Sequence, residues 1–177
     1  FDPGIPEFPG NDVQLDSLQR SYTFQGYQVY QLADGTVSVS DLGDIDKARL
    51  IYEVDIKDTI TQVINYEFDA IMGQAVPVLK ASGPNEGIRH SFQILTDAFA
   101  QGDNRLINHK TYHFLASAYG YNNYGTYNPL AGSGQDEQYK ASRKAAVGSI
   151  RSYNGIPHNP TPEAGGTVTS AKYGDGV

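Results

Sequence analysis

The sequence has no cysteine and no tryptophan, and only one methionine among its 177 residues. Without cysteine the chain can form neither disulfides nor thiolate metal sites, and it has no thiol nucleophile. No apolar run approaches the ~20 residues of a membrane-spanning helix, so no membrane insertion is expected. Positive charge is scarce as well: 13 Lys and Arg against 20 Asp and Glu give a net charge of -7, which argues against nucleic acid as a partner.

The residues that are abundant are those of turns and strands. There are 19 Gly, 9 Pro and 13 Tyr, a composition that favours an all-β fold with long loops. Three ranges differ in character: 1–20 is a linker or a set of incomplete N-terminal strands, 21–155 is the β-rich domain, and 156–177 is an extended Pro/Gly-rich tail or interdomain linker. Because the chain begins at Phe1 and not at Met, we expect it to be a piece of a longer polypeptide.

Alternation of apolar and polar residues locates the expected strands. It predicts strands at 22–32, 36–39, 49–56, 59–68, 76–79, 88–96, 112–121 and 147–153. Lys57-Asp58 is expected to turn a hairpin between the third and fourth of these, and 136–146 is expected to contain a helical turn. Pro77 would confine its strand to a sheet edge, because proline has no N–H to donate.

The best-patterned stretch runs from Leu106 to Tyr119. A leucine, a polar turn and Tyr112 six positions later predict a tyrosine corner, in which the ring enters the core and the hydroxyl bonds backbone near the turn. Leu106 and Tyr112 are therefore structural residues in this interpretation. The period of the following strand would send Phe114, Ala116 and Ala118 inward, and Leu115, Ser117 and Tyr119 outward.

The order of these strands resembles an immunoglobulin-like, fibronectin type III-like antiparallel sandwich. Tyr27-Gln28-Val29 is similar to the Tyr-x-Val motif of the third strand of that family, and Leu106 with Tyr112 is similar to its tyrosine corner. The tryptophan-bearing second strand of the family has no counterpart, because the sequence has no Trp and only 1–20 precedes the Tyr-x-Val strand.

Several longer phrases narrow the resemblance: FQGYQVYQL at 24–32, DNRL at 103–106, YGYNNY at 119–124 and IPHNP at 156–160. Together they resemble the fibronectin-like region of large bacterial surface proteins exported by the type IX secretion system. The resemblance implies a secreted or cell-surface location and a non-enzymatic structural, adhesive or spacer role, with neighbouring domains or subunits as partners. Missing first strands would leave a sheet edge to be covered, so β-strand complementation by a neighbour is a further expectation.

Two kinds of metal site are conceivable from the sequence. Asp41, Asp44 and Asp46 could offer carboxylate oxygens to calcium, although the spacing is not that of an EF-hand and a solvated acidic turn is the simpler interpretation. His109 and His113 have a spacing that binds zinc on a helix, but a turn and a strand separate them here. No other cofactor is expected.

Catalysis has no specific signal. Glu53, Asp55, Glu67 and Asp69 could in principle supply a glycosidase pair, but acidic residues on strands commonly just face solvent. The sequence carries no Gly-x-Ser-x-Gly elbow, and no enzyme activity is predicted.

Tyrosines gather around the end of the 112–121 strand. Tyr119, Tyr121, Tyr124 and Tyr127, with Tyr30 on the neighbouring strand, could form a partner-binding surface, since tyrosine offers rigid contact area and a hydrogen-bonding tip. A carbohydrate-binding accessory module using this loop is the alternative function. The simpler interpretation is that several of these rings pack over the end of the sandwich.

Overall fold

The computed structural model describes residues 21–142 and 150–158, and within these ranges it is all-β and contains no α-helix. The elements are β1 (Thr23–Leu32), the 3-10 turn η2 (Val39–Asp41), β2 (Ala48–Asp55), β3 (Val63–Asp69), β4 (Gln74–Ala81), β5 (Tyr112–Tyr121), β6 (Tyr139–Ala141) and β7 (Tyr153–Gly155). Every strand pairing is antiparallel.

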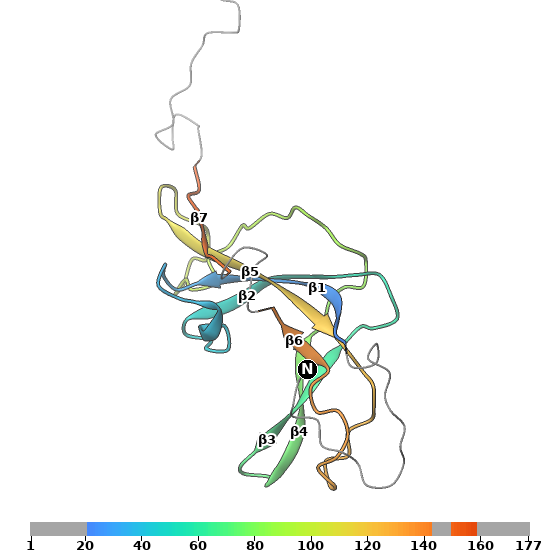
Figure 1. Ribbon diagram of the computed structural model, residues 1–177. Coiled ribbons are helices and arrows are strands. Elements are labelled where there is room, and N and C mark those ends of the chain that lie inside the picture. Colours follow the sequence, from blue (N-terminus) through green and yellow to red (C-terminus); the bar gives the residue numbers. More distant parts are fainter. Residues whose placement is uncertain (1–20, 143–149, 159–177) are drawn as a thin grey trace, which may run out of the picture.

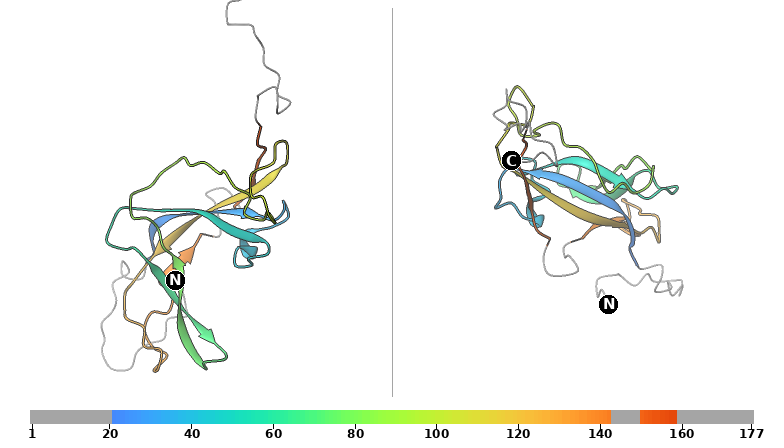
Figure 2. Two further views of the ribbon diagram at one scale, coloured as in Figure 1. Left: turned by 180° about the vertical axis from the view of Figure 1, so that it is seen from behind. Right: turned by 90° about the horizontal axis from the view of Figure 1, so that it is seen from above.

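Two antiparallel sheets pack together, which confirms the expected all-β sandwich. The larger has the order β2-β1-β5-β6, with β7 pairing the other end of β5, and the smaller is the β3-β4 hairpin. The hairpin stands away from the larger sheet and touches it only at its base (Figures 1 and 2). Val63, Ala81 and Tyr119 make this contact, with Tyr139 packed against them.

One face of the β1-β5 pair, here called the inner face, carries two hydrophobic clusters. The register places Tyr30 beside Leu115 and Gln28 beside Ser117 on this face. Towards the end of β1 lies the aliphatic end, built on Leu32, Val37, Ala48 and Leu115. Towards the start of β1 lies the tyrosine end, built on Val63, Ala81 and Tyr119 under the hairpin.

A buried glutamine separates the two clusters. Gln28 is 1% exposed, and its Nε2 donates to Glu53 Oε1 at 3.0 Å and to the carbonyl of Lys80 at 2.8 Å. Its Oε1 accepts hydrogen bonds from the hydroxyls of Tyr30 at 3.0 Å and Tyr139 at 2.7 Å. All donor and acceptor positions of the amide are therefore used, as burial demands.

The opposite face of the same strands, here called the outer face, is covered by the long loop 82–111. Asp97 is 6% exposed and accepts hydrogen bonds from Gln31 Nε2 at 2.6 Å and Lys110 Nζ at 2.9 Å. Although burial raises the pKa of Asp97, these hydrogen bonds outweigh it and hold the pKa below its ordinary value. Tyr52 stacks on Phe92 with ring centres 4.1 Å apart, so the loop is fixed by polar and aromatic contacts together.

Tyr112 has the geometry expected of a corner residue. Its ring is 3% exposed, and its hydroxyl accepts a hydrogen bond from the backbone N–H of Ile107 at 2.9 Å. The predicted facing of β5 is wrong, however: Leu115, Ser117 and Tyr119 are buried, whereas Ala116 is exposed. The reason is that Tyr112 lies on the outer face under the loop, while the hydrophobic clusters fill the other face.

The other expected strands divide into those found and those not found. Strands at 22–32, 49–56, 59–68, 76–79 and 112–121 correspond to β1, β2, β3, β4 and β5, and Pro77 does lie on an edge strand. The hairpin around Lys57-Asp58 is wrong, because β2 pairs with β1 and β3 pairs with β4.

Three more expectations fail. Residues 36–39 lead into a 3-10 turn whose N-cap is Ser38, and 88–96 crosses the outer face without strand pairing apart from a bridge at Thr96. Tyr139–Ala141 is a strand and not part of a helical turn. The segment 1–20, the tail 156–177 from residue 159 onward, and residues 147–149 of the expected closing strand lie outside the described residues; of the rest of that strand, only Tyr153 is in a strand, at the start of β7.

Candidate interaction edge

β2 forms one edge of the larger sheet. Within 21–142 and 150–158, β2 pairs with a strand only on its β1 side. Alternate residues of an edge strand point N–H and C=O groups away from the sheet, which makes such an edge a template for another strand. β2 contains neither proline nor glycine, although a register shift against β1 leaves Ile51 as a bulge in it.

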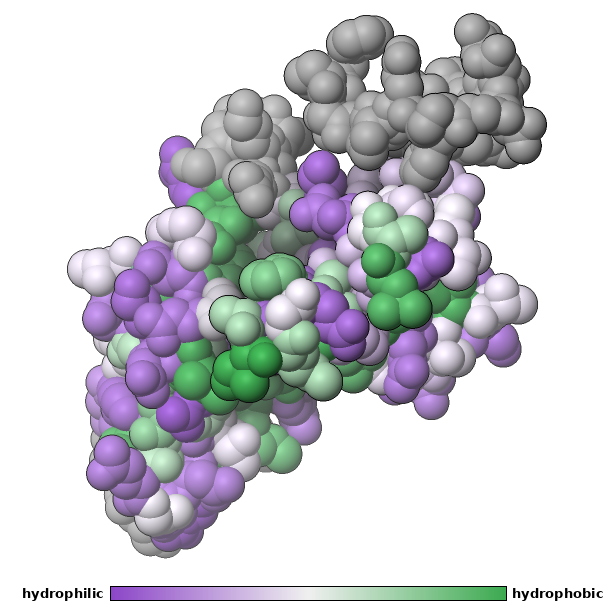
Figure 3. All heavy atoms as spheres, turned by 90° about the horizontal axis from the view of Figure 1, so that it is seen from below, coloured by the Kyte–Doolittle hydropathy of each residue, from purple (hydrophilic) through white to green (hydrophobic). Residues whose placement is uncertain are grey.

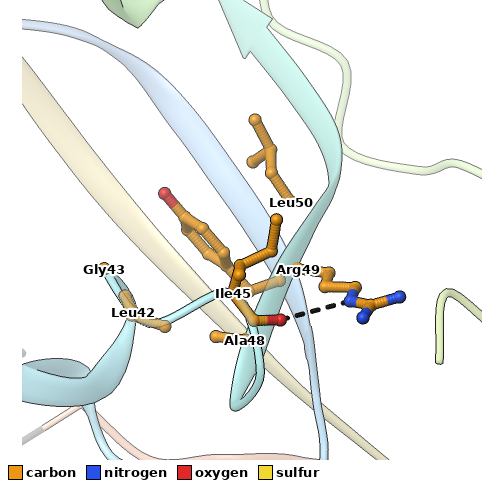
Figure 4. A pocket seen from close by; sticks show the side chains of 7 residues that line it. Leu42, Gly43, Ile45, Ala48, Arg49 and Leu50 are labelled. Atoms are coloured by element: carbon orange, nitrogen blue, oxygen red, sulfur yellow. Dashed lines mark hydrogen bonds between the residues drawn. The ribbon is translucent and has the colours of Figure 1, made fainter. Parts of the chain in front are cut away.

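An apolar groove lies directly beside this edge. Its volume is about 470 Å³, and the side chains that line it come from β1, β2 and the turn before β2: Tyr30, Leu42, Gly43, Ile45, Ala48, Arg49 and Leu50. Ile45 and Leu50 lie close together along it (Figure 4). Ile45 is 71% exposed and Leu50 is 47% exposed, so aliphatic surface faces solvent next to unpaired backbone.

The turn that forms one wall of the groove is held by several hydrogen bonds. Asp41 accepts hydrogen bonds from the backbone and hydroxyl of Ser38 at 3.0 and 2.7 Å and from Lys47 Nζ at 2.8 Å. These hydrogen bonds, led by that from Lys47, lower the pKa of Asp41. On the other side, Arg49 Nε donates to the carbonyl of Ile45 at 3.2 Å, which ties the turn to β2.

The edge of the hairpin strand β4 differs from the edge of β2 in its sequence. Pro77 lies in the middle of β4 and has no N–H, so a strand added there would lose a hydrogen bond. Lys80 adds a charge on the same strand, where it pairs with Glu67. Both features are devices that protect sheet edges; β2 lacks the proline but has charged residues and a bulge at Ile51.

The acidic loop is used for local structure. Asp44 Oδ1 accepts a hydrogen bond from the backbone of Asp46 at 3.0 Å, and Lys47 Nζ stands between Asp41 and Asp44, at 2.8 and 4.0 Å. Across 21–142 and 150–158, no group of three or more His, Asp or Glu is arranged to hold a metal ion. The structure therefore places Asp41, Asp44 and Asp46 in one turn, in which Lys47 is the cation that Asp41 and Asp44 contact.

The five tyrosines singled out by the sequence do not form one exposed row. Tyr119 is 2% exposed and stacks on Tyr139, and Tyr30 faces the inner cluster with its hydroxyl on Gln28. The expectation that Tyr30 and Tyr119 face outward is thus wrong.

The other three tyrosines are half-buried. Tyr121 packs against the tyrosine end, and Tyr127 lies against Tyr66 with ring centres 4.6 Å apart. Tyr124 is held through its backbone by Gln135. Packing over the end of the sandwich describes these rings better than a platform for sugars.

The carboxylates considered for catalysis are also engaged structurally. Glu53 accepts from Gln28 and from the backbone of Ser82, and Asp55 accepts from the backbone of Asn85 at 2.7 Å. Burial raises the pKa of Glu53, partly offset by these hydrogen bonds. His113 Nδ1 lies 2.8 Å from Asn154 Oδ1, and His109 packs on His158.

Sequence reasoning did not find the groove. Leu42, Ile45 and Leu50 belong to a loop and a strand that were assigned separately, and the pairing of β2 with β1 brings them together. The alternation in 49–56 was the available signal, but it was used to predict a hairpin with 59–68.

The described residues form an all-β antiparallel module in which β2 is an edge strand. In the comparison with known proteins, no family model, no curated protein and no solved structure matches the chain. Across the described ranges, no helix is long and apolar enough to span a membrane.

Proposed function

We propose that this chain is a non-enzymatic structural and adhesive module of a secreted, multidomain cell-surface protein, joined to a neighbouring domain or subunit by β-strand complementation at β2. The observation that carries the docking part is the unpaired outward edge of β2 beside the groove lined by Ile45 and Leu50. The location and the fibronectin type III-like family rest on the sequence resemblance.

The chemistry of the site favours an extended peptide segment as the ligand. The β2 backbone would supply hydrogen bonds that do not depend on sequence, and the groove would accept an apolar side chain projecting from the added strand. Division of labour between backbone affinity and side-chain specificity is typical of strand addition. Leu42, Ile45 and Leu50 are the residues that would select the apolar side chain.

Crosslinking in the complete protein tests this proposal. A photoreactive residue at Leu50, on the groove, should crosslink to an extended segment of a neighbouring domain or subunit, and mass spectrometry would identify that segment. The matched control is Leu79 on β4, which is similarly exposed at 54% but lies on the strand that Pro77 interrupts. Equal crosslinking at both positions, or none at Leu50, would contradict the proposal.

Hydrogen exchange gives an independent readout. The amides of β2 that point away from β1 should exchange more slowly in the complete assembly than in the chain alone. Unchanged exchange along the whole of β2 would exclude an added strand.

A further inference from the structure

Two of the four histidines of the chain lie ring beside ring at the end of the larger sheet that is away from the hairpin. His109 belongs to the turn that precedes β5, and His158 belongs to the chain that leaves β7. The ring centres are 5.1 Å apart and the ring planes are inclined at 54°. These two segments, which are distant in the sequence, lie side by side in Figure 1.

The backbones that carry the two rings are joined independently of the side chains. The N–H of His109 donates to the carbonyl of Pro157, the residue before His158, at 2.9 Å. β7 pairs with the start of β5, where Gly155 lies opposite Tyr112. His109 has a φ of 66°, a left-handed conformation in which histidine is enriched relative to most other side chains. The fold therefore sets the distance between the two imidazoles.

Both imidazoles are available to a ligand from solvent. His109 and His158 are exposed, and among residues 21–142 and 150–158 no hydrogen bond or ion pair occupies either ring. The next residue along the turn, Lys110, directs its Nζ to Asp97 at 2.9 Å and so is neutralised by a carboxylate. A cation that approaches the histidines therefore meets two unused nitrogen donors and a lysine that is already paired.

The spacing of the rings is that of two imidazoles bound to one metal ion. Zn²⁺ binds imidazole nitrogen at about 2.0–2.1 Å, and in tetrahedral coordination two bound imidazoles have their ring centres about 5 Å apart. The separation of 5.1 Å between His109 and His158 agrees with this value. Rotation about χ2, which is a broad torsion in histidine, turns the nitrogens towards a common point. No movement of the backbone is needed.

We propose that His109 and His158 form an open two-histidine site for a divalent transition-metal ion such as Zn²⁺, with water in the remaining coordination positions. Imidazole suits Zn²⁺, Cu²⁺ and Ni²⁺, whereas Ca²⁺ and Mg²⁺ prefer oxygen ligands. Across the described ranges no third His, Asp or Glu completes the set, so the ion binds reversibly and more weakly than in a closed site with four protein ligands.

A bound ion would clasp the turn before β5 to the chain that follows β7. The clasp fixes the direction in which the chain leaves the sheet, because the ion adds a second link beside the hydrogen bond from His109 to Pro157. The site does not depend on docking at β2, whose groove is lined by other residues. It is also separate from the side towards which the hairpin projects, where hydrophobic side chains stand among hydrophilic ones (Figure 3).

The histidine ring signals in NMR spectra test this proposal, because the chain carries its own controls. In a Zn²⁺ titration of the untagged full chain, the signals of His109 and His158 should shift together and saturate at one ion per chain. Those of His90, which is exposed elsewhere, and His113, whose Nδ1 lies 2.8 Å from Asn154 Oδ1, should stay in place. Equal shifts of all four histidines, or no shift of the pair up to ~1 mM Zn²⁺, would overturn the proposal.

Three matched substitutions give a second test by isothermal titration calorimetry with Zn²⁺. His109→Asn and His158→Asn should each weaken binding by at least ~10-fold, the loss that follows removal of even an outer-shell partner of a metal. Asparagine is chosen because it tolerates the left-handed conformation of His109. His90→Asn, the control at an exposed position, should leave binding unchanged.

Hydrogen exchange shows whether the ion acts as a clasp. Zn²⁺ should slow the exchange of the His109 amide, which donates to Pro157, in the wild-type chain but not in His158→Asn. Zinc binding to His158→Asn that is as tight as to the wild-type chain, or an equal loss of binding in His90→Asn, contradicts the two-histidine site. Unchanged exchange of the His109 amide in the zinc-bound wild-type chain contradicts the clasp.

Discussion

The tyrosine end and the aliphatic end of the inner face are covered in opposite ways. At the tyrosine end, the base of the hairpin and the rings of Tyr119 and Tyr139 close over Val63 and Ala81. At the aliphatic end, the turn around η2 and Ile150 pack on the cluster of Leu32 and Leu115, and the groove beside β2 remains open among the described residues. The closed end therefore contributes stability, and the open end is where binding is expected.

This difference reverses the functional expectation attached to the tyrosines. Tyrosines are versatile contact residues, but here their hydroxyls are used internally, as when those of Tyr30 and Tyr139 both donate to Gln28. The aliphatic side chains of Ile45 and Leu50 have no polar atom to satisfy, and they remain exposed. Exposed aliphatic surface next to an open edge is the stronger indication of a partner.

The largest loss of stability is expected when the packing of the tyrosine end is removed. Tyr119→Ala removes a ring that is 2% exposed and stacks on Tyr139 at 5.3 Å, and the cavity left behind should cost about 4 kcal/mol of unfolding free energy. Denaturant titration would measure the loss. Tyr119→Phe keeps the ring and should cost far less. A loss below about 1 kcal/mol for Tyr119→Ala would mean that the tyrosine end is not a core.

The next effect concerns the glutamine that divides the two ends. Gln28→Leu still fills the space but leaves the hydroxyls of Tyr30 and Tyr139 and the carbonyl of Lys80 without their hydrogen-bond partner. We therefore expect the unfolding free energy to fall by about 3 kcal/mol. Gln101→Leu, at an exposed position, should change stability by less than about 0.5 kcal/mol. Equal stability of the two variants would show that the buried amide contributes nothing.

Alkaline titration should test the burial of Tyr30, Tyr119 and Tyr139 at both ends without mutation. Burial raises the pKa of Tyr30 to about 12 and raises the pKa values of Tyr119 and Tyr139 as well. The folded chain thus retains protons that the unfolded chain releases near pH 10, so stability is full below pH ~10 and falls as the pH rises towards 12. Phenolate absorbance should show these tyrosines ionising last, together with unfolding. A single phase near pH 10 with the fold intact would contradict this.

The sequence allowed most strands to be predicted but not their partners. Period-2 alternation is a local property, so β1 and β5 were found within a residue or two. Pairing depends on contacts distant in sequence, and Lys57-Asp58 suggested a hairpin although β2 in fact returns to β1. The facing of β5 was misjudged because both of its faces are covered, one by the hairpin and clusters and the other by a loop fixed through Asp97.

The candidate site was harder still to predict. Tyr112 was identifiable because its corner involves residues only five apart, with the hydroxyl bonded to Ile107. The groove joins Tyr30 to Ile45 and Leu50, and neither spacing nor composition links a β1 residue to the turn before β2. Only the register of β1 against β2 creates that surface, and register is a property of the folded sheet.

The smallest change in stability is expected at the groove itself, and it is the most direct test of the difference between the two ends. Ile45→Ser should change the unfolding free energy by less than about 0.5 kcal/mol, because the side chain is already 71% exposed. Leu115→Ala, at 1% exposure in the cluster beneath the same end, should cost about 3 kcal/mol. Paired denaturant titrations would check both values. If Ile45→Ser cost as much unfolding free energy as Leu115→Ala, Ile45 would belong to the core and the aliphatic end would be closed. If Ile45→Ser leaves the unfolding free energy unchanged but weakens association with the partner, the binding surface is distinct from the core that supports it.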